Sequence, residues 1–202
     1  MSENDKILDL TEEKIFKEGF YKTTMEELAS DLRMSKKTIY KFYPSKNDLV
    51  RAITERFKKR IHDKILEILS SDKNAVDKIV TWLSILTKVT TKISDKMLND
   101  LRKHFPSLWD ELEKFRTEMM TDNITKVIEQ GKQEGFVKDI PTPIIMTVMI
   151  SSVRAIVNPE FVIHNNFSLK NAAQTTFQIL MNGILTERGK ELFNKSLNEN
   201  ER

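Results

Sequence analysis

Apolar residues recur along most of this chain at intervals of three and four, which is the period of an amphipathic α-helix. The clearest run spaces its apolar residues by four: Leu49, Ile53, Phe57, Ile61, Ile65 and Leu69. Strict alternation of apolar and polar residues, which indicates a half-buried strand, is scarce. The pattern therefore predicts an all-α protein, with body helices over residues 46–70, 72–93, 95–104, 106–134, 142–157 and 168–185.

The predicted helix over residues 142–157 differs from the others because its apolar residues occur nearly all round it. We expect Thr142 to cap this helix, Pro143 to open it, and Ser168 to cap the helix that follows. A helix without a polar face must be covered on both sides. Either the core of a single chain or a second copy of the chain could provide that cover.

Residues 24–46 hold two short helical patterns joined by a tight turn. Thr24 and Glu27 have the spacing of a capping box at the start of the first helix, and Ser35 stands at the N-cap of the second. Ile39 and Tyr43 share one face of the second helix, and Pro44 ends it. This arrangement is typical of a helix-turn-helix whose second helix enters the major groove of DNA.

Charge is distributed unevenly along the chain. Residues 33–60 carry ten basic and two acidic side chains, a local net charge of +8, whereas the whole chain has only +3. Residues 1–32 carry net −5, and residues 61–202 balance to zero. A basic run alone is compatible with a solvated helix face. Concentration of the charge beside the helix-turn-helix instead indicates binding to the phosphates of a nucleic acid.

Residues 7–50 resemble the DNA-binding head of the TetR (tetracycline-repressor-like) family of bacterial transcriptional regulators. The residues that carry the resemblance are Ile7, Leu8, Ile15, Gly19, Phe20, Thr23, Thr24, Glu27, Leu28, Ala29, Ser35, Lys36, Thr38, Ile39, Tyr40, Tyr43, Pro44, Ser45, Lys46 and Leu49. The resemblance implies a three-helix DNA-binding head, residues 1–48, and a helical ligand-binding and dimerisation body, residues 49–202. It also implies a homodimer in which the helices over 142–157 and 168–185 form a four-helix interface with their counterparts.

Three positions depart from what is usual in that family. Arg33 and Lys37 stand where glycine is common, and Tyr43 stands where phenylalanine is common. Glycine permits a left-handed backbone at no cost from a Cβ atom, so Arg33 puts the geometry of the turn in question. A buried tyrosine needs a hydrogen-bond partner for its hydroxyl, so Tyr43 predicts such a partner.

The chemistry of the side chains suggests a division of the DNA contacts. We expect Thr24, Tyr40 and Lys46 to contact phosphates, and Lys36, Lys37 and Thr38 to reach base edges. Phe42 could make an apolar contact in the groove or pack inside the module. The full predicted set is Thr24, Ser35, Lys36, Lys37, Thr38, Tyr40, Lys41, Phe42 and Lys46. A two-fold dimer would present two such surfaces to half-sites roughly 34–36 Å apart, so the operator should be near-palindromic.

Aromatic residues and methionines on the body helices are the candidates for a ligand pocket, although ordinary core packing would use the same residues. The predicted set is Trp82, Met97, His104, Phe105, Trp109, Phe115, Met119, Met120, Met146, Met149, Arg154 and Phe161. Arg154 lies in an apolar helix, and a buried cation needs an anionic partner. That partner could be a ligand carboxylate or an acidic residue of the protein.

Catalytic function has little support. The chain has no cysteine, its three histidines are isolated, and the HExxH, GxSxG and glycine-rich phosphate-loop patterns are missing. We therefore expect no catalytic residue, metal site or cofactor. A helical adaptor that does not bind DNA is the alternative, but it leaves the basic segment unexplained.

The ends and the apolar runs bear on localisation. The N-terminus is acidic and lacks the apolar core of a signal peptide, and the most apolar run, residues 144–150, is too short to span a bilayer. We expect a cytoplasmic regulator, usually a repressor in the resembled family, that a small-molecule effector releases from double-stranded DNA.

Overall fold

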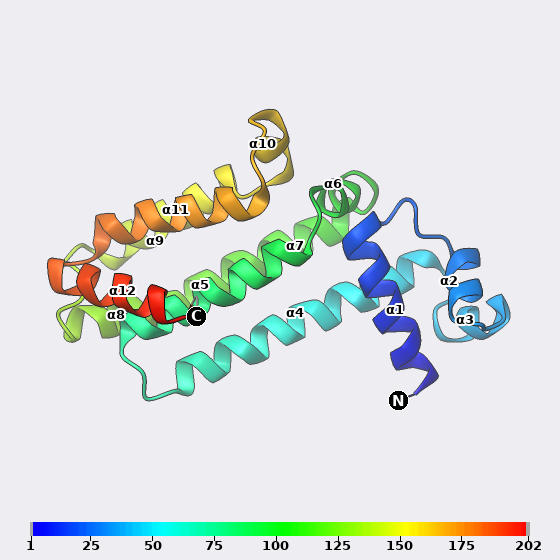
Figure 1. The fold of residues 1–202 in the computed structure, drawn as a ribbon, viewed down its shortest axis with the longest axis horizontal. Coiled ribbons are helices and arrows are strands. Elements are labelled where there is room, and N and C mark those ends of the chain that lie inside the picture. The colour runs from blue at the N-terminus through cyan, green and yellow to red at the C-terminus, as the bar shows by residue number, and fades with distance from the viewer. Residues whose placement is uncertain (1, 201–202) are drawn as a thin grey trace. The chain divides into compact units, whose positions relative to one another are not determined.

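A computed structural model describes residues 2–200, except for the side chains of Asp95 and Asn200. The described residues contain no strand, and a single antiparallel bridge joins Val137 to Leu185. The all-α prediction is confirmed. The elements, shown in Figure 1, are α1 (Glu3–Glu18), α2 (Met25–Asp31), α3 (Lys36–Phe42), α4 (Lys46–Ser70), α5 (Ala75–Lys92), α6 (Asp95–His104), α7 (Pro106–Met119), the π-helical turn η1 (Met120–Ile124), α8 (Thr125–Gln133), α9 (Thr142–Ile156), α10 (Pro159–His164), α11 (Leu169–Ile184) and α12 (Glu187–Asn200).

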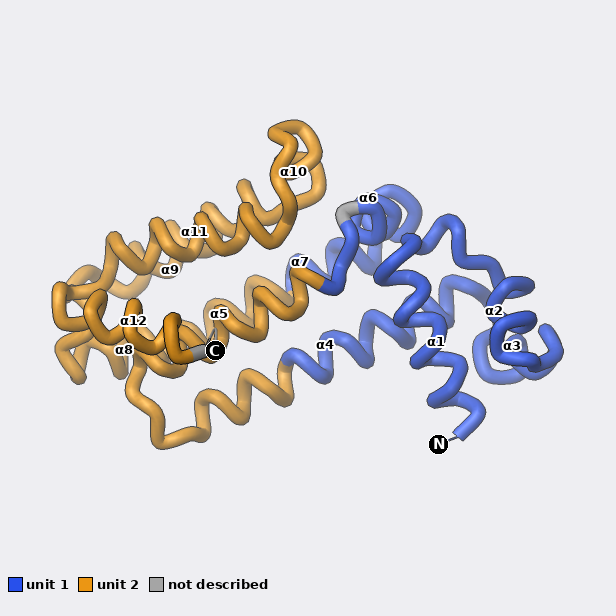
Figure 2. The backbone as a smooth tube through the Cα atoms, viewed as in Figure 1, with its two compact units in different colours: residues 1–61, 92–114 blue, residues 62–91, 115–202 orange. Residues whose placement is uncertain are grey.

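The chain divides into two compact units (Figure 2). Unit 1 comprises residues 1–61 and 92–114, and unit 2 comprises residues 62–91 and 115–202. Helices α4 and α7 each contribute residues to both units. The boundary expected after residue 48 falls inside unit 1, so a DNA-binding domain limited to residues 1–48 stays a prediction.

Unit 1 is built around the helix-turn-helix. Its fully buried side chains come from α1, α2, α3, α4 and α6 and from the segment after α1: Ile7, Ile15, Phe20, Leu28, Ile39, Leu49, Ile53 and Leu101. The rings of Phe20 and Phe105 lie 5.4 Å apart, which joins the end of α1 to the end of α6. Burial of apolar side chains from all these elements gives the short helices α2 and α3 a stability that they would lack as isolated peptides.

Helix α1 ends against α6 through a polar contact. Gly19 has a φ of 87°, and the Tyr21 backbone N–H donates a hydrogen bond of 3.0 Å to the Asp100 carboxylate. A Cβ atom on Gly19 would collide with that same carboxylate oxygen. The Tyr21 ring also stacks on His104, with centroids 5.4 Å apart. Glycine is required at this position both by the backbone angle and by the close approach of α6.

In unit 2, α9 and α11 lie side by side (Figure 1). Val76, Val80, Ile128, Met149 and Met181 are among the buried side chains of this unit. Apolar side chains also face outward from the same two helices, namely Ile144, Val148 and Ile179. The described residues of the chain therefore do not cover all of the apolar surface of α9, whose apolar residues occur nearly all round it.

Several predicted helix limits are confirmed: α4 and α6 have the expected bounds, and the Ser168 side chain caps α11. The cap of α9 was wrong by one position. Thr142 is the first residue of that helix and makes no cap, because its hydroxyl contacts Glu129 and Lys132 on α8 instead. The start of α5 also differs, since the Asn74 side chain accepts the Asp77 N–H at 2.9 Å and begins the helix later.

The helix predicted over residues 106–134 is interrupted by η1. A π-helical turn inserts one residue into the ladder of backbone hydrogen bonds. It changes the apolar pattern too little for the turn to be predicted from the sequence. Asn123 is buried in this turn and donates a hydrogen bond of 3.0 Å to the Met119 carbonyl. Two helices were not predicted: α10 forms where a loop was expected, and α12 follows the last expected helix.

No helix in the described range 2–200 combines the length and the apolar character needed to cross a bilayer.

Candidate nucleic-acid interface and ligand pocket

Side-chain caps fix both helices of the helix-turn-helix. The Thr24 hydroxyl accepts the Glu27 N–H at 3.1 Å, and the Glu27 carboxylate accepts the Thr24 N–H at 3.0 Å. The Ser35 hydroxyl accepts the Thr38 N–H at 3.1 Å at the start of α3. Both predicted caps are confirmed. They satisfy backbone donors that would otherwise be unpaired at the N-termini of α2 and α3.

The turn between α2 and α3 contains a left-handed residue. Arg33 has a φ of 52°, and the next residue, Met34, donates its N–H to the Ala29 carbonyl at 2.9 Å. The backbone at this position therefore has the conformation that glycine adopts most easily. The departure from glycine at Arg33 does not change the turn; the arginine adopts the left-handed angle at a cost in energy.

Helix α3 buries one face and exposes the other. Ile39 is completely buried and Tyr43, just after the helix, is 8% exposed. The Tyr43 hydroxyl has a hydrogen-bond partner, as predicted. It donates to the side-chain oxygen of Asn4 at 2.5 Å. Burial raises the pKa of the Tyr43 phenol. The outward face carries Lys36, Lys37, Tyr40, Lys41 and Phe42, all exposed, and the half-buried Thr38.

Ion pairs neutralise part of the basic charge between residues 33 and 60. Five of the ten basic side chains between residues 33 and 60 pair with acids: Lys36 with Glu26, Arg51 with Glu111, Arg56 with Asp9, Lys58 with Glu55, and Arg60 with Glu12. Four of these five lie on α4, paired with acids of α1, α4 and α7. The local net charge of +8 counted along the sequence therefore overstates the charge available to phosphates, because much of it is neutralised within unit 1.

Lys37, Lys41 and Lys46 make no ion pair with any residue in the described part of the chain. Lys46 begins α4, where the Ser45 hydroxyl accepts the Asp48 N–H at 3.2 Å. Burial lowers the pKa of Lys46, and the nearby carboxylates of Asp100 and Glu27 offset part of that effect. A phosphate at this helix N-terminus would interact favourably with the ammonium and with the free backbone N–H groups.

The expected ligand residues do not come together. Met97, His104, Phe105 and Trp109 belong to unit 1, and the others belong to unit 2. Trp82 and Met149 line a small apolar cavity of about 20 Å³, together with residues such as Ile128 and Met181. Met119, Met120 and Met146 are buried, Phe115 is half-buried, and none of these four lines either pocket described here.

Arg154 is not the buried cation that its apolar helix suggested. Its side chain is exposed, and its guanidinium donates a hydrogen bond of 2.8 Å to the Thr117 hydroxyl. Helix α9, which bears Arg154, is not fully buried. Part of its apolar surface faces outward, at Ile144 and Val148. An exposed guanidinium remains hydrated, so Arg154 needs no anionic partner.

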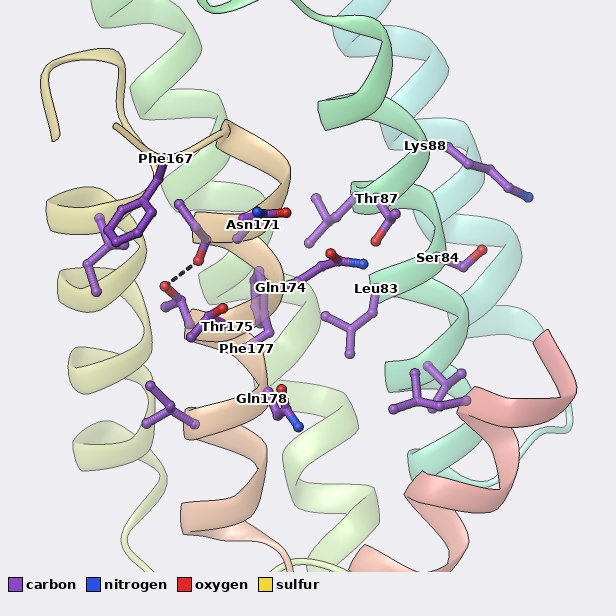
Figure 3. Close-up of a pocket in the computed structure, with 18 of the residues that line it drawn as sticks. Leu83, Ser84, Thr87, Lys88, Phe167, Asn171, Gln174, Thr175, Phe177 and Gln178 are labelled. Carbon is purple, nitrogen blue, oxygen red and sulfur yellow. Dashed lines mark hydrogen bonds between the residues drawn. The ribbon is translucent and has the colours of Figure 1, made fainter. Parts of the chain in front are cut away.

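A larger pocket of about 910 Å³ lies in unit 2, and Figure 3 shows it between α5 and α11. Of the expected ligand residues, Phe161 alone is among those that line it. The polar side chains of Asn171, Gln174 and Gln178, which α11 contributes, were not predicted. Their spacing of three and four places them on one side of the helix, and that row of carboxamides was the available signal.

Comparisons with known proteins agree with this architecture. Residues 7–53 match the family model described as bacterial regulatory proteins, tetR family. An uncharacterised HTH-type transcriptional regulator of Bacillus subtilis, YvaF, is 26% identical over 177 residues, which cover 86% of this chain and 92% of that protein. A solved TetR-family regulator from Marinobacter aquaeolei has a TM-score of 0.75 at 20% identity, covering 97% of this chain and 99% of its own.

A solved transcriptional regulator from Cytophaga hutchinsonii has a TM-score of 0.68 at 19% identity, covering 91% of this chain and 98% of its own. The likeness to both solved structures thus extends over the helix-turn-helix and the helical body together. Residues 7–53 thus form a capped helix-turn-helix that matches the tetR family model, and the whole chain shares its fold with solved TetR-family regulators, as expected for a DNA-binding transcriptional regulator.

Proposed function

We propose that the chain is a cytoplasmic, ligand-responsive repressor that binds a near-palindromic operator as a homodimer and leaves it when a small-molecule effector binds. The observation that carries this proposal is the outward face of α3 and the start of α4. Lys37, Lys41 and Lys46 are cations without a partner in the described chain, and Thr24 and Tyr40 add exposed hydroxyls. This mixture of ammonium and hydroxyl donors suits phosphates and base edges.

Homodimer formation is supported by α9 and α11. Ile144, Val148 and Ile179 are exposed on two helices that lie side by side. Apolar residues grouped on an outward face mark a surface that another protein covers. A two-fold dimer covers that face symmetrically and presents two α3 helices to two half-sites.

Response to an effector is supported by the pocket in unit 2. Its volume of about 910 Å³ lies within the range of small-molecule sites, roughly 300–1,000 Å³. An effector that binds the DNA-incompetent state more tightly shifts the population toward it, and operator affinity falls by the same coupling free energy.

The test is selection of duplex DNA from a random pool with the purified full chain, followed by binding measurements over a range of salt concentrations. Lys41 and Lys46, the unpaired lysines not assigned to base edges, give four phosphate-binding cations in a dimer and predict an affinity loss of about a hundredfold between about 50 and 200 mM salt. The selected sites should be near-palindromic. Recovery of no preferred sequence, with binding insensitive to salt, would instead favour a helical adaptor.

A further inference from the structure

The two long walls of the pocket in unit 2 have different chemistry. On α5, Leu83 and Thr87 point toward α11, whereas Ser84 and Lys88 point away from it (Figure 3). On α11, the Gln174 side chain extends toward Leu83 and Thr87 (Figure 3). The α11 wall thus offers carboxamides across the pocket to a largely apolar wall on α5.

Four uncharged polar side chains of the pocket are available to a ligand. The carboxamides of Asn171, Gln174 and Gln178 and the Thr87 hydroxyl make no hydrogen bond with any other residue of the described range. A carboxamide both donates and accepts hydrogen bonds, so these groups can pair with either kind of ligand atom. They form one hydrogen-bonding edge, because the three carboxamides recur at intervals of three and four along α11.

Charge is nearly absent from this pocket. Among residues 2–200 no acidic residue, histidine or arginine lines it, and Lys88 is the single charged side chain that this described range contributes. The Lys88 ammonium extends away from α11 (Figure 3). An ion placed between Leu83 and Gln174 would give up part of its hydration without gaining a counter-charge, which is unfavourable for either sign.

The inner part of the pocket is apolar. Val80, Ala173 and Phe177 are buried side chains of its lining. Leu83 and Phe177 also line the small neighbouring cavity, in which Trp82 takes part. A ligand's apolar part would therefore lie against Leu83 and Phe177, close to the Trp82 ring.

We infer that this pocket takes an uncharged molecule that has an apolar body and one hydrogen-bonding edge, held by the carboxamides of Asn171, Gln174 and Gln178. This inference rests on the proposed function only in treating the pocket as the effector site. It assigns the ligand's chemical class, and it excludes organic cations and carboxylates as tight ligands.

Three probes with the same apolar chain separate the alternatives: decanamide, decanoate and decylammonium, each used below the concentration at which it self-associates. The full chain is prepared as Trp109→Phe, which leaves Trp82 as the only tryptophan of the two in the sequence. Trp82 fluorescence then reports binding beside the pocket. Decanamide should bind with a dissociation constant at least about tenfold lower than either ion, since the ions bury an uncompensated charge.

A variant tests whether the carboxamide edge is responsible. Gln174→Leu replaces an exposed carboxamide by an apolar group of similar size and should weaken decanamide binding about tenfold. Gln133→Leu is the matched control, because Gln133 is an exposed glutamine on α8 outside the pocket lining. Equal binding of decanamide and decylammonium, equal effects of the two variants, or no binding of decanamide would each overturn the assignment.

Operator release is measured in parallel, with the same probes and the selected DNA. If decanamide binds in a Gln174-dependent way but the operator stays bound, the pocket chemistry stands and the proposed effector response fails. If decylammonium or decanoate binds more tightly and releases the operator, the ligand response stands and the uncharged class fails.

Discussion

At the scale of single residues, Arg33 is the position where the chain departs from glycine and accepts a left-handed backbone, with φ of 52°. Such a backbone costs roughly 1–2 kcal/mol for a residue with a Cβ atom, and glycine loses about 0.5–1 kcal/mol through its freedom in the unfolded chain. Arg33→Gly should therefore stabilise the protein by about 0.5–1 kcal/mol. Urea unfolding of the two proteins measures this difference.

The control is Arg33→Lys, which keeps the charge and the Cβ atom and should leave the free energy of unfolding within about 0.5 kcal/mol of the original. A loss of stability in Arg33→Gly would mean that the arginine side chain makes a contribution larger than the backbone cost. The resemblance to the TetR family identified this position from the sequence, because glycine is common there and permits a left-handed backbone.

We expect Glu26 to compete with DNA for Lys36. The two side chains form an ion pair, and the neighbouring Lys36 ammonium lowers the pKa of the Glu26 carboxyl. Glu26→Gln should free Lys36 and remove a negative charge from the DNA-facing side. Operator affinity should rise several-fold at low salt, with a steeper dependence on salt concentration.

Glu13→Gln is the control for that measurement, since Glu13 is an exposed acid on α1 to which the described residues contribute no ion pair. If both variants raise affinity equally, the gain comes from net charge and not from Lys36. The pairing itself was beyond sequence analysis, because Glu26 and Lys36 are on different helices and meet only when the turn at Arg33 is formed.

Lys46 and Lys37 are expected to act differently on DNA. Lys46→Ala removes a cation at the start of α4, so it should weaken binding to all sequences about equally and reduce the salt slope by about 1 for each half-site. Lys37→Ala removes an exposed cation on α3 and should change which sequences are preferred. Binding to the selected operator and to unrelated duplexes distinguishes these results, and a uniform loss for Lys37→Ala would contradict base reading.

At the scale of elements, the junction of α1 with α6 depends on Gly19 and Asp100. Alanine at Gly19 would need a strained positive φ, and its Cβ atom would displace the Asp100 carboxylate from the Tyr21 N–H. Gly19→Ala should therefore destabilise the protein by about 2 kcal/mol or more. Unfolding in urea is again the measurement.

A double-mutant cycle separates the two causes. In an Asp100→Ala background the collision is removed and only the backbone cost remains, so Gly19→Ala should then cost about 1 kcal/mol less. Additive effects of the two substitutions would show that the carboxylate contact carries no energy. The resemblance identified Gly19 from the sequence. The Asp100 carboxylate beside it, which accepts the Tyr21 N–H, could not be identified because it lies 79 residues from Tyr21 along the chain.

The elements also show where periodicity stops being informative. Long amphipathic helices such as α4 were predicted with their observed bounds because side-chain caps and a regular apolar stripe agree. The π-helical turn η1 was missed because it shifts the backbone ladder and leaves the composition unchanged. Helix α12 was missed because its polar sequence packs few side chains inward: of those described, Phe193 and Ser196 are the buried ones.

For the whole molecule, the outward apolar residues of α9 and α11 decide between a dimer and a single chain. Ile179 on α11 is 66% exposed and Leu66 on α4 is 47% exposed, so both offer an apolar side chain to solvent. Only Ile179 has further exposed apolar residues, Ile144 and Val148, on a helix packed beside its own. A stable protein–protein interface buries about 1,200–2,000 Å² of surface, so it needs several neighbouring apolar residues and not a single one.

Ile179→Glu should therefore give a monomer in sedimentation experiments, because a carboxylate buried in an apolar interface without a partner is strongly unfavourable. Leu66→Glu should remain dimeric. Operator affinity should fall steeply for Ile179→Glu alone, since a monomer engages one half-site and loses the gain from binding two sites together. If Ile179→Glu stayed dimeric and bound the operator normally, the two α3 helices would have to be joined through another surface.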